Sequence, residues 1–399
     1  YMGLIGSVFG VASVAGPLLG GFFVDNLSWR WVFYVNVPIG AVAIAVVLLR
    51  LRLPAGGVRH RVDYLGAALL TGGVSALILL TTWGGDQYAW GSPMIVGLGV
   101  GGLALLVAFV LQEHRAAEPV LPLRLFRSSV FSVACGLALL IGLAMFGAII
   151  FIPLYLQTVY GASPTSSGLR MLPLILGLLA ASITSGRVIT RIGRYRAFPI
   201  AGTAILTVGM VLLAQLAVDT PPWVASAYML VVGIGIGLVM QVLVLVVQND
   251  APVGDIGTAT STATFFRSVG GAFGVAILGA IFASRLAHQL AGLPAGAAAR
   301  LGSGVHISPL QARHLPPAIH ARFLQAFAHA LHGVFLWGAV LSAAAFALSW
   351  LLKEVPLRTT LHRVAQATSE QAVSGGTGAE ALAVLADPRK ATGPARPMR

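Results

Sequence analysis

The sequence predicts an all-α polytopic membrane protein, and two observations carry that prediction. Of the 399 residues, 57% are hydrophobic and only 9% are charged, whereas about 25% of the residues in a soluble globular domain are charged. Ten apolar runs of about 20 residues follow one another along the chain, and a helix of that length crosses the hydrocarbon core of a bilayer. This composition excludes a soluble enzyme or a soluble binding domain.

The ten expected helices cover residues 2–24, 32–50, 64–83, 93–112, 130–156, 167–189, 197–217, 222–247, 263–284 and 329–352. Alternate connections carry the arginines, in the segments 50–61, 115–127 and 187–196. Because cytoplasmic loops are enriched in Lys and Arg, these connections are predicted to be cytoplasmic, which places both ends of this chain in the cytoplasm. An aromatic belt at the outer interface then comprises Trp29, Trp31, Trp83, Trp90 and Trp223.

The first apolar run carries small residues on one helical face. At spacings of three and four along a helix lie Gly6, Gly10, Ser13, Pro17 and Gly20. In lipid, helices associate where small residues let their backbones approach, as Gly6-xxx-Gly10 and Gly16-xxx-Gly20 would allow. Pro17 removes a backbone donor and bends the helix, which a membrane tolerates only beside a neighbour or a wet cavity. We expect this helix to pack closely and to flex beside something polar.

The same stretch resembles the fifth helix of the major facilitator superfamily, in its branch of fourteen-span drug:proton antiporters. The antiporter motif of that branch, with a Gly followed by GP and then GG, matches Gly10, Gly16, Pro17, Gly20 and Gly21. The junction that follows looks like the WRWxFxxNxPxG pattern of the branch and comprises Trp29, Arg30, Trp31, Asn36, Pro38 and Gly40. The resemblance extends over residues 1 to about 352.

The resemblance implies an architecture for the whole chain. In the fourteen-span branch two extra helices join two halves of six helices, so the ten spans correspond to helices five to fourteen, and the chain is expected to be truncated before them. The implied parts are residues 1–50 (the remainder of the first half), 51–128 (two linking helices and a cytoplasmic linker) and 129–352 (the second half). Residues 353–399 have too few apolar side chains for a core and are expected to form a disordered cytoplasmic tail.

The internal repeat of the superfamily supplies two further matches. Residues 186–196 resemble the G-xxxx-DRxGRRR loop motif through Gly186, Arg191, Gly193, Arg194 and Arg196. Thr190 stands where that motif has Asp, so this segment is read as the degenerate copy in the second half. A glycine-rich helix with Gly270, Gly271, Gly274 and Gly279 occupies the position of the antiporter helix one half later.

Larger polar groups within or near the spans form a candidate substrate cavity, comprising Asn36, Tyr155, Gln157, Gln215, Gln241 and Arg267, with Met145, Phe146 and Met240 as adaptable apolar neighbours. Each polar group has the alternative of an interhelical hydrogen bond or a lipid-facing position. For Arg267 and Arg170, snorkelling to the interface or pairing with backbone carbonyls is the favoured reading. Asp63, which precedes an apolar run, is predicted to cap a helix.

None of the twelve carboxylates lies in the middle of an apolar run. In the family that the sequence resembles, the proton-binding residue lies in the first helix, so no proton-binding residue is assigned to this chain. Six histidines lie in or just after the external connection between residues 285 and 322, namely His288, His306, His314, His320, His329 and His332. They are expected to be solvated, and the chain is expected to bind no metal and no cofactor.

The sequence therefore predicts a secondary active exporter. Its expected substrates are drugs or other amphipathic or cationic small molecules, and in the intact protein it is expected to work by proton antiport. It contains no Gly-Lys-Ser/Thr phosphate-binding loop and no HExxH motif, so ATP hydrolysis by that route and an enzymatic function are not expected. Expected partners are the lipid bilayer of the plasma membrane, a small-molecule substrate and, in the intact protein, protons. The net charge of +13 reflects membrane orientation rather than nucleic-acid binding. Two alternatives stay open: a dedicated exporter of one endogenous metabolite, and a truncated chain that transports nothing.

Overall fold

The computed structural model describes residues 2–50, 63–85, 87–116, 118–290 and 316–356. The chain divides into two units, Tyr1–Glu354 and Val355–Arg399, and the described helices all belong to the first. These helices are α1 (Met2–Asn26), α2 (Trp31–Tyr34), α3 (Asn36–Arg50), α4 (Tyr64–Trp83), α5 (Pro93–Glu113), η1 (Leu123–Arg127), α6 (Ser129–Thr158), α7 (Pro164–Arg170), α8 (Leu172–Ile192), α9 (Ala197–Ala214), α10 (Pro222–Asp250), η2 (Val253–Asp255), α11 (Ile256–Leu290) and α14 (Pro317–Ser349).

The predicted class, an all-helical membrane protein, is confirmed. Among the described residues, nine helical segments are long and apolar enough to cross a membrane, and α1, with 25 residues, is a further helix of spanning length. The expected spans coincide with these helices, but several helices extend past the apolar runs. The last three differ most: α10 ends at Asp250, α11 begins at Ile256, and α14 begins at Pro317. A helix continues into polar sequence wherever its backbone hydrogen bonds are kept, so the end of an apolar run does not mark the end of a helix.

Side-chain caps and proline fix several helix starts. Ser92 precedes Pro93 and accepts a hydrogen bond from the Ile95 amide at 3.4 Å, and Ser163 precedes Pro164 and accepts one from the Ser166 amide at 3.2 Å. Proline at the first helical position lacks only a donor that would have no partner within the helix. At the other end of a helix, Gly193 closes α8 with φ +74°, a conformation that glycine adopts without steric cost.

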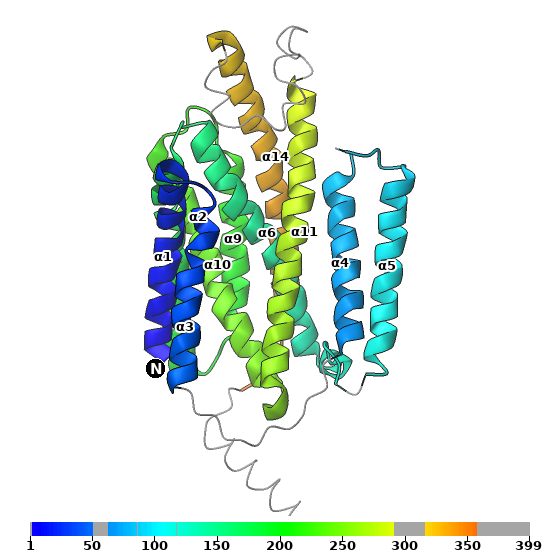
Figure 1. The fold of residues 1–399 in the computed structure, drawn as a ribbon. Coiled ribbons are helices and arrows are strands. Elements are labelled where there is room, and N and C mark those ends of the chain that lie inside the picture. The colour runs from blue at the N-terminus through cyan, green and yellow to red at the C-terminus, as the bar shows by residue number, and fades with distance from the viewer. Residues whose placement is uncertain (1, 51–62, 86, 117, 291–315, 357–399) are drawn as a thin grey trace, which may run out of the picture. The chain divides into compact units, whose positions relative to one another are not determined.

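Within the first unit the helices form a bundle with two attachments (Figure 1). Helices α6, α8, α9, α10, α11 and α14 pack against one another around a core that includes Tyr155, Met210 and Phe282. The α4–α5 hairpin packs against α11, and α1 packs against α7. An ion pair of 2.6 Å between Arg124 in η1 and Asp255 in η2 joins the segment before α6 to the turn before α11.

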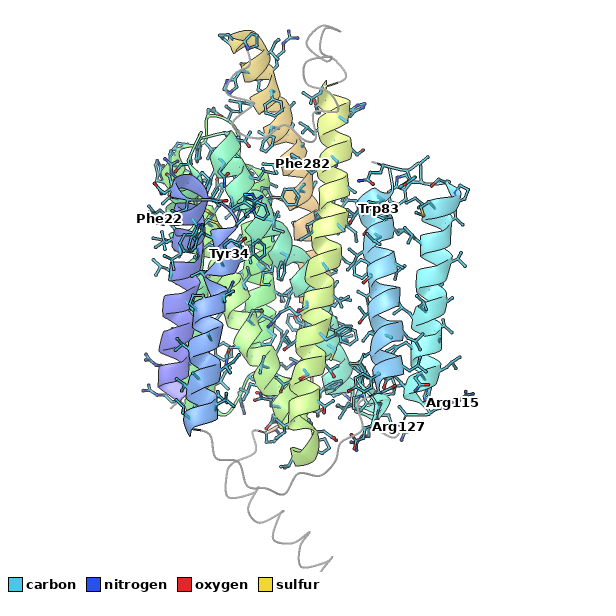
Figure 2. The ribbon with its side chains drawn as sticks, in the orientation of Figure 1. Phe22, Tyr34, Trp83, Arg115, Arg127 and Phe282 are labelled. Carbon is cyan, nitrogen blue, oxygen red and sulfur yellow. The ribbon has the colours of Figure 1, made fainter. Side chains whose placement is uncertain are left out.

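Charged and aromatic side chains lie at opposite ends of the α4–α5 hairpin. Figure 2 shows Arg115, just beyond α5, and Arg127, in η1, at one end, and Trp83, the last residue of α4, at the other. This separation agrees with the expected alternation of arginine-bearing and aromatic connections. Which end faces the cytoplasm stays a prediction.

The connection expected between residues 285 and 322 is shorter than predicted. Helix α11 continues to Leu290 and α14 begins at Pro317, while residues 291–315, with His306 and His314, lie outside the described residues. His329 and His332 lie within α14, and the Nδ1 atom of His332 is 2.6 Å from the carbonyl oxygen of Ala214 in α9. His332 is therefore an exposed residue that makes an interhelical contact, and it does not lie in a loop, because α14 starts twelve residues before the expected span. The expectation of a disordered tail falls almost entirely on residues outside the described ranges.

Asp63 caps α4 as predicted, and its removal gives a first test. Its Oδ1 atom accepts hydrogen bonds from the Gly66 amide at 2.9 Å and from Nε2 of Gln112 in α5 at 3.3 Å. We expect Asp63→Ala to cost about 1 kcal/mol of stability at the start of α4, the usual cost of losing a cap. Hydrogen exchange of the Gly66 amide should then quicken about fivefold. Asp63→Asn, which keeps a capping oxygen, is the matched control, and equal exchange rates in both variants would contradict the assignment.

Candidate functional site

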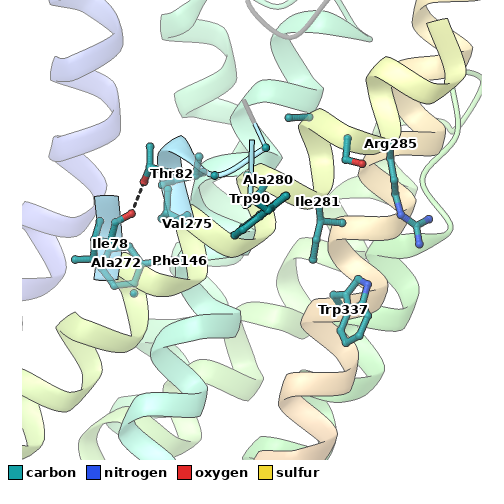
Figure 3. Close-up of a pocket in the computed structure, with 18 of the residues that line it drawn as sticks. Ile78, Thr82, Trp90, Phe146, Ala272, Val275, Ala280, Ile281, Arg285 and Trp337 are labelled. Atoms are coloured by element: carbon teal, nitrogen blue, oxygen red, sulfur yellow. Dashed lines mark hydrogen bonds between the residues drawn. The ribbon is translucent and has the colours of Figure 1, made fainter. Parts of the chain in front are cut away.

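A cavity of about 1460 Å³ lies among α4, the turn after it, α6, α11 and α14. Figure 3 shows its lining from these elements, including Phe146 from α6, Ile281 from α11 and Trp337 from α14. Apolar and aromatic side chains make up most of that lining. A cavity of this size and character accommodates a large, mainly apolar molecule.

The cavity exists because α11 presents small residues toward it. Along α11 the lining residues include Gly271, Ala272, Ala276, Gly279, Ala280 and Ala283. A Cβ built on Gly279 would have nothing within 4 Å, so this position opens directly into the cavity, whereas one built on Gly271 would lie 2.5 Å from the ring of Phe146. Phe146 therefore rests against the α11 backbone, and the face beyond it stays open.

A tight turn after α4 positions Trp90 at the cavity. Gly85 has φ +81°, and a Cβ at Gly84 or Gly85 would lie 2.7 or 2.6 Å from the indole of Trp90. The absence of side chains at these two positions lets the indole lie directly over the turn. Trp90 thus contributes an aromatic wall that depends on the glycine pair.

Polar groups are few on the cavity wall. Thr82 is satisfied within its own helix, since its Oγ1 donates to the Ile78 carbonyl at 2.8 Å. Ser268 and Ser284 add hydroxyl groups, and Arg285 is the one charged side chain on the described wall of the cavity. No carboxylate appears among the described lining residues. The arrangement combines a broad apolar surface with a single positive charge.

The six residues of the predicted substrate cavity do not line this cavity, and the structure does not bring them together. The hydroxyl of Tyr155, which is 1% exposed, donates to the Ala217 carbonyl at 2.7 Å. Nε2 of Gln157 donates to Ser167 Oγ at 3.1 Å and joins α6 to α7. Both side chains therefore hydrogen-bond to neighbouring segments, which is the alternative to substrate contact that the sequence analysis left open.

The other four candidates are dispersed. The exposed Asn36 donates to the Val32 carbonyl at 3.1 Å, across the break between α2 and α3. Gln215, at the end of α9, and Gln241, in α10, are exposed. Arg267 lies beside a small void of about 10 Å³, with Nη1 3.8 Å from the sulfur of Met240. A role for these six residues in substrate binding stays a prediction.

Arg170 contacts an aromatic ring, an arrangement that the sequence did not suggest, while its snorkelling to the interface stays a prediction. Its guanidinium carbon lies 5.5 Å from the centre of the Tyr160 ring, at cation–π distance. Burial raises the pKa of Tyr160, so at neutral pH its hydroxyl stays protonated and donates to the Thr220 carbonyl at 2.7 Å. The pair ties the segment between α6 and α7 to the segment between α9 and α10.

The antiporter-motif helix, α1, contacts α7 through Pro17, which lies on the expected small-residue face, and through Gly21 of the motif. A Cβ on Gly21 would lie 2.6 Å from Thr165 Cα, and one on Gly168 would lie 2.7 Å from the Pro17 carbonyl oxygen. Asp25 accepts hydrogen bonds from the amide and the hydroxyl of Thr165 at 2.8 and 2.5 Å. The close contact therefore involves Pro17 and Gly21 on α1.

The expected close contact at Gly16 and Gly20 is not found, because a Cβ at either position would have nothing within 4 Å. These residues face away from α7, one position before Pro17 and Gly21 in the helical turn. Gly6 and Gly10 belong to α1, but their surroundings lie outside the described part of the chain. The predicted close contact at Gly16 and Gly20 was therefore wrong, whereas Pro17, from the same predicted face, does meet α7.

The junction motif is exposed. Arg30 stacks on Trp29 at 5.6 Å, and the rings of Trp31 and Tyr34 meet edge to face at 6.1 Å. Pro38 and Gly40 lie in α3, where a Cβ on Gly40 would meet nothing within 4 Å. The aromatic residues stay at a helix end, as an interfacial role requires.

The second-half loop motif joins the α8–α9 turn to the end of α14. Arg196 donates from Nη2 to the Trp350 carbonyl at 2.9 Å, and the hydroxyl of Tyr195 donates to the Lys353 carbonyl at 3.0 Å. Thr190, in place of the Asp of the motif, donates to the Gly186 carbonyl at 2.8 Å. Gly186 and Arg191 lie on α8, and Gly193 and Arg194 follow in the turn.

The sequence did not identify Trp90 and Trp337, which supply aromatic walls of the cavity, or Arg285, which supplies its positive charge. One signal was present in the charge pattern. No Asp or Glu occurs between Asp255 and Glu354, a stretch that contains all of α11 and α14. Arg285 and Arg267, both in α11, therefore have no acidic residue on α11 or on α14 with which to form an ion pair. Their positive charges call for another partner.

A bundle of membrane-spanning helices with a large, mainly apolar cavity among them is the architecture of a membrane transporter. The family model described as Major Facilitator Superfamily matches residues 1–63 and 62–275. The chain belongs to the major facilitator superfamily.

Relatives support this membership. An uncharacterised MFS-type transporter of Mycobacterium tuberculosis (strain H37Rv) is 45% identical over 362 residues, covering 91% of this chain and 52% of that protein. The multidrug transporter protein MdtP of Bacillus subtilis (strain 168) is 34% identical over 384 residues, covering 90% of this chain and 70% of MdtP. The chain therefore spans about half the length of its mycobacterial relative.

Among solved structures, a bacterial homologue of the human lysosomal transporter Spinster, in an inward-facing and unoccupied conformation, matches with a TM-score of 0.47 and 14% sequence identity. The match covers 88% of this chain and 83% of the other.

Proposed function

We propose that the protein is a secondary active exporter of amphipathic small molecules, driven by proton antiport in the intact protein. The observation that carries the proposal is the cavity of about 1460 Å³ with its apolar and aromatic walls. Pockets for drug-sized ligands commonly measure about 300–1,000 Å³, so this cavity has room for molecules of different shapes. Few polar groups fix the orientation of such a molecule, which favours a broad substrate range.

Family membership and relatives point the same way. The related proteins of Bacillus subtilis carry the names multidrug transporter protein MdtP and multidrug resistance protein 3, the latter 32% identical over 343 residues. The sequence contains no Gly-Lys-Ser/Thr phosphate-binding loop. We therefore assign the driving force to an ion gradient across the plasma membrane, with the arginine-bearing connections on the cytoplasmic side.

The contact between α1 and α7 suggests how the carrier moves. In the superfamily, alternating access is largely rigid-body rocking of one half against the other. Here a backbone contact at Pro17, Gly21 and Gly168 joins α1 to α7, and we assign α1 to the first half and α7 to the second. We propose that this contact slides or opens as the carrier alternates.

Transport into inside-out membrane vesicles tests the proposal. A panel of radiolabelled amphiphiles should accumulate in vesicles with an acidic interior, and nigericin, which collapses the pH gradient, should abolish the accumulation. Gly279→Leu should reduce accumulation several-fold because its side chain enters the cavity. Gly257→Leu is the matched control, since this position on the same helix is equally open but does not line the cavity.

Three outcomes would contradict the proposal. Accumulation of one compound alone would indicate a dedicated exporter of that compound. Accumulation that survives nigericin would exclude proton antiport. An absence of accumulation with any compound, from vesicles that contain folded protein, would indicate that this chain does not transport.

A further inference from the structure

Arg285 stands where two cavities meet. It lines the large cavity and also a second one of about 320 Å³, together with Ser284, His288, Gln289 and His329. The first is mainly apolar, whereas every residue that lines the second is polar. A molecule that spans both cavities would have its apolar part in one and its polar part in the other.

A glycine on α14, Gly333, leaves space for the Arg285 side chain. A Cβ built on Gly333 would collide with the Cδ, Nε and Cζ atoms of Arg285. The guanidinium group of α11 therefore lies against the bare backbone of α14, and Figure 3 shows Arg285 reaching toward that helix on the side where Trp337 lies. This position is set by the glycine and not by an acidic partner.

Among the described residues, no acidic side chain balances the positive charge of Arg285. In the described part of the chain, Arg285 forms no ion pair, and its guanidinium has no hydrogen-bond partner. The sequence from 256 to 353 has no carboxylate, and the second cavity contributes two imidazoles, of His288 and His329. An arginine with its donors unused recognises carboxylate, sulfonate or phosphate oxygens through charge-assisted hydrogen bonds.

We propose that this site binds an amphiphile with an anionic head, the head at Arg285 and the apolar body in the large cavity against Trp90, Ile281 and Trp337. The inference rests on the proposed function and narrows its substrate class to organic anions. Cationic amphiphiles are disfavoured, because the wall of the cavity offers a positive charge and, among the described residues, no carboxylate. Ser284 and Gln289 supply neutral groups beside the head.

Equilibrium binding tests the inference without requiring transport. Radiolabelled dodecanoate is bound to the full 399-residue chain in phosphatidylcholine nanodiscs, and empty nanodiscs measure partitioning into lipid. Dodecanoate should be displaced poorly by dodecanol or dodecyltrimethylammonium, which have the same chain and a neutral or cationic head. Arg285→Gln should weaken dodecanoate binding at least tenfold, and Arg285→Lys should restore part of the loss.

Two further variants complete the test: one removes a positive charge elsewhere on α14, and the other displaces the Arg285 side chain without removing its charge. Arg322→Gln removes the same charge from an exposed position on α14 that lines neither cavity, and it should leave binding within twofold of the original. Gly333→Ala keeps the charge but displaces the guanidinium, so it should weaken binding although no charge is lost. Elution as a single species in size-exclusion chromatography establishes that each variant is folded.

Asp86 provides a further control. It lies outside the described residues, but it follows Gly85 in the sequence and is the acidic residue nearest in sequence to the cavity lining after α4. If Arg285 serves a ligand, Asp86→Asn should leave dodecanoate binding unchanged or stronger. A loss of binding in this variant equal to that of Arg285→Gln would overturn the inference, since the two residues would then act as an ion pair.

Lipid composition separates two sources of the anionic head. If phosphatidylglycerol nanodiscs abolish dodecanoate binding to the original chain, a lipid headgroup occupies the site. If binding persists, a free amphiphile does, and both results support an anionic head at Arg285. Equal binding by Arg285→Gln, or equal affinity for dodecyltrimethylammonium, refutes it. Because binding needs no gradient, failed transport in vesicles would leave this inference standing, and successful transport that is indifferent to Arg285→Gln would remove it.

Discussion

Gly274→Val is expected to abolish folding of the chain, the largest effect that we predict for a single substitution. A Cβ on Gly274 would collide with the Leu143 carbonyl oxygen and lie 2.8 Å from Leu143 Cα. Gly270 stands in the same relation to Leu139, and from the other side a Cβ on Gly142 would lie 3.1 Å from the amide nitrogen of Gly271. Helices α6 and α11 are therefore in backbone contact over two turns.

Backbone neighbours make this substitution costly. Overpacking against side chains usually costs about 1–3 kcal/mol, because side chains can shift. The Leu143 backbone belongs to a helix that also packs on α10 and α14, so we expect a cost above that range. A loss of this size is a large fraction of the roughly 5–15 kcal/mol that stabilises a typical protein.

The readout is the fraction of protein that elutes as a single species, together with its melting temperature. Gly279→Val is the matched control on the same helix, five residues further on, where a Cβ meets nothing within 4 Å. We expect the control to fold and the Gly274 variant to aggregate. Recovery of both variants with equal melting temperatures would show that α6 and α11 can separate without loss of structure.

The sequence predicted this contact in part. The sequence identified a glycine-rich helix that includes Gly270 and Gly274, and the length of the apolar runs identified the helices. It did not identify the partner, since a stripe of glycine is compatible with any neighbouring helix. Only the folded chain shows that Gly270 and Gly274 meet Leu139 and Leu143 of α6.

The cavity could not be predicted for a related reason. Polar residues within spans, such as Tyr155 and Gln157, satisfy their hydrogen bonds with neighbouring segments, as buried polar groups in a membrane must. Hydropathy does not distinguish such a residue from one that faces a cavity. The actual lining depends on small residues of α11 and on Trp90, which the turn after α4, far away in sequence, brings beside that helix.

The α1–α7 contact also shows that the sequence does not determine which residues of a helix face a given neighbour. The sequence predicted a close contact on the small-residue face of α1. Pro17 of that face does make it, but together with Gly21 and without Gly16 and Gly20. Neighbouring residues on a helix point about 100° apart. A shift of one position therefore selects a different face, and the arrangement of α7 decides which face is used.

Gly168→Val should accordingly loosen α1 from α7. The new side chain would meet the Pro17 carbonyl oxygen, which lies 2.7 Å from a Cβ at this position. Since that neighbour is backbone, the helices must separate, at a cost of about 1–3 kcal/mol or more. The Thr165 amide, which donates to Asp25 at 2.8 Å across the same contact, reports the separation, and its hydrogen exchange should quicken at least about tenfold.

Gly16→Val and Gly20→Val are the matched controls, because they add the same side chain to α1 at positions with nothing within 4 Å. Exchange of the Thr165 amide should stay within about twofold of the original in both, and Gly21→Val, which faces Thr165 directly, should behave like Gly168→Val. A quickening of exchange in Gly20→Val equal to that in Gly168→Val would place the contact on the face that the motif alone suggested. Because Gly20→Val and Gly21→Val differ only in the direction of one added side chain, the difference between their exchange rates measures which face of α1 contacts α7, independently of any change in helix propensity.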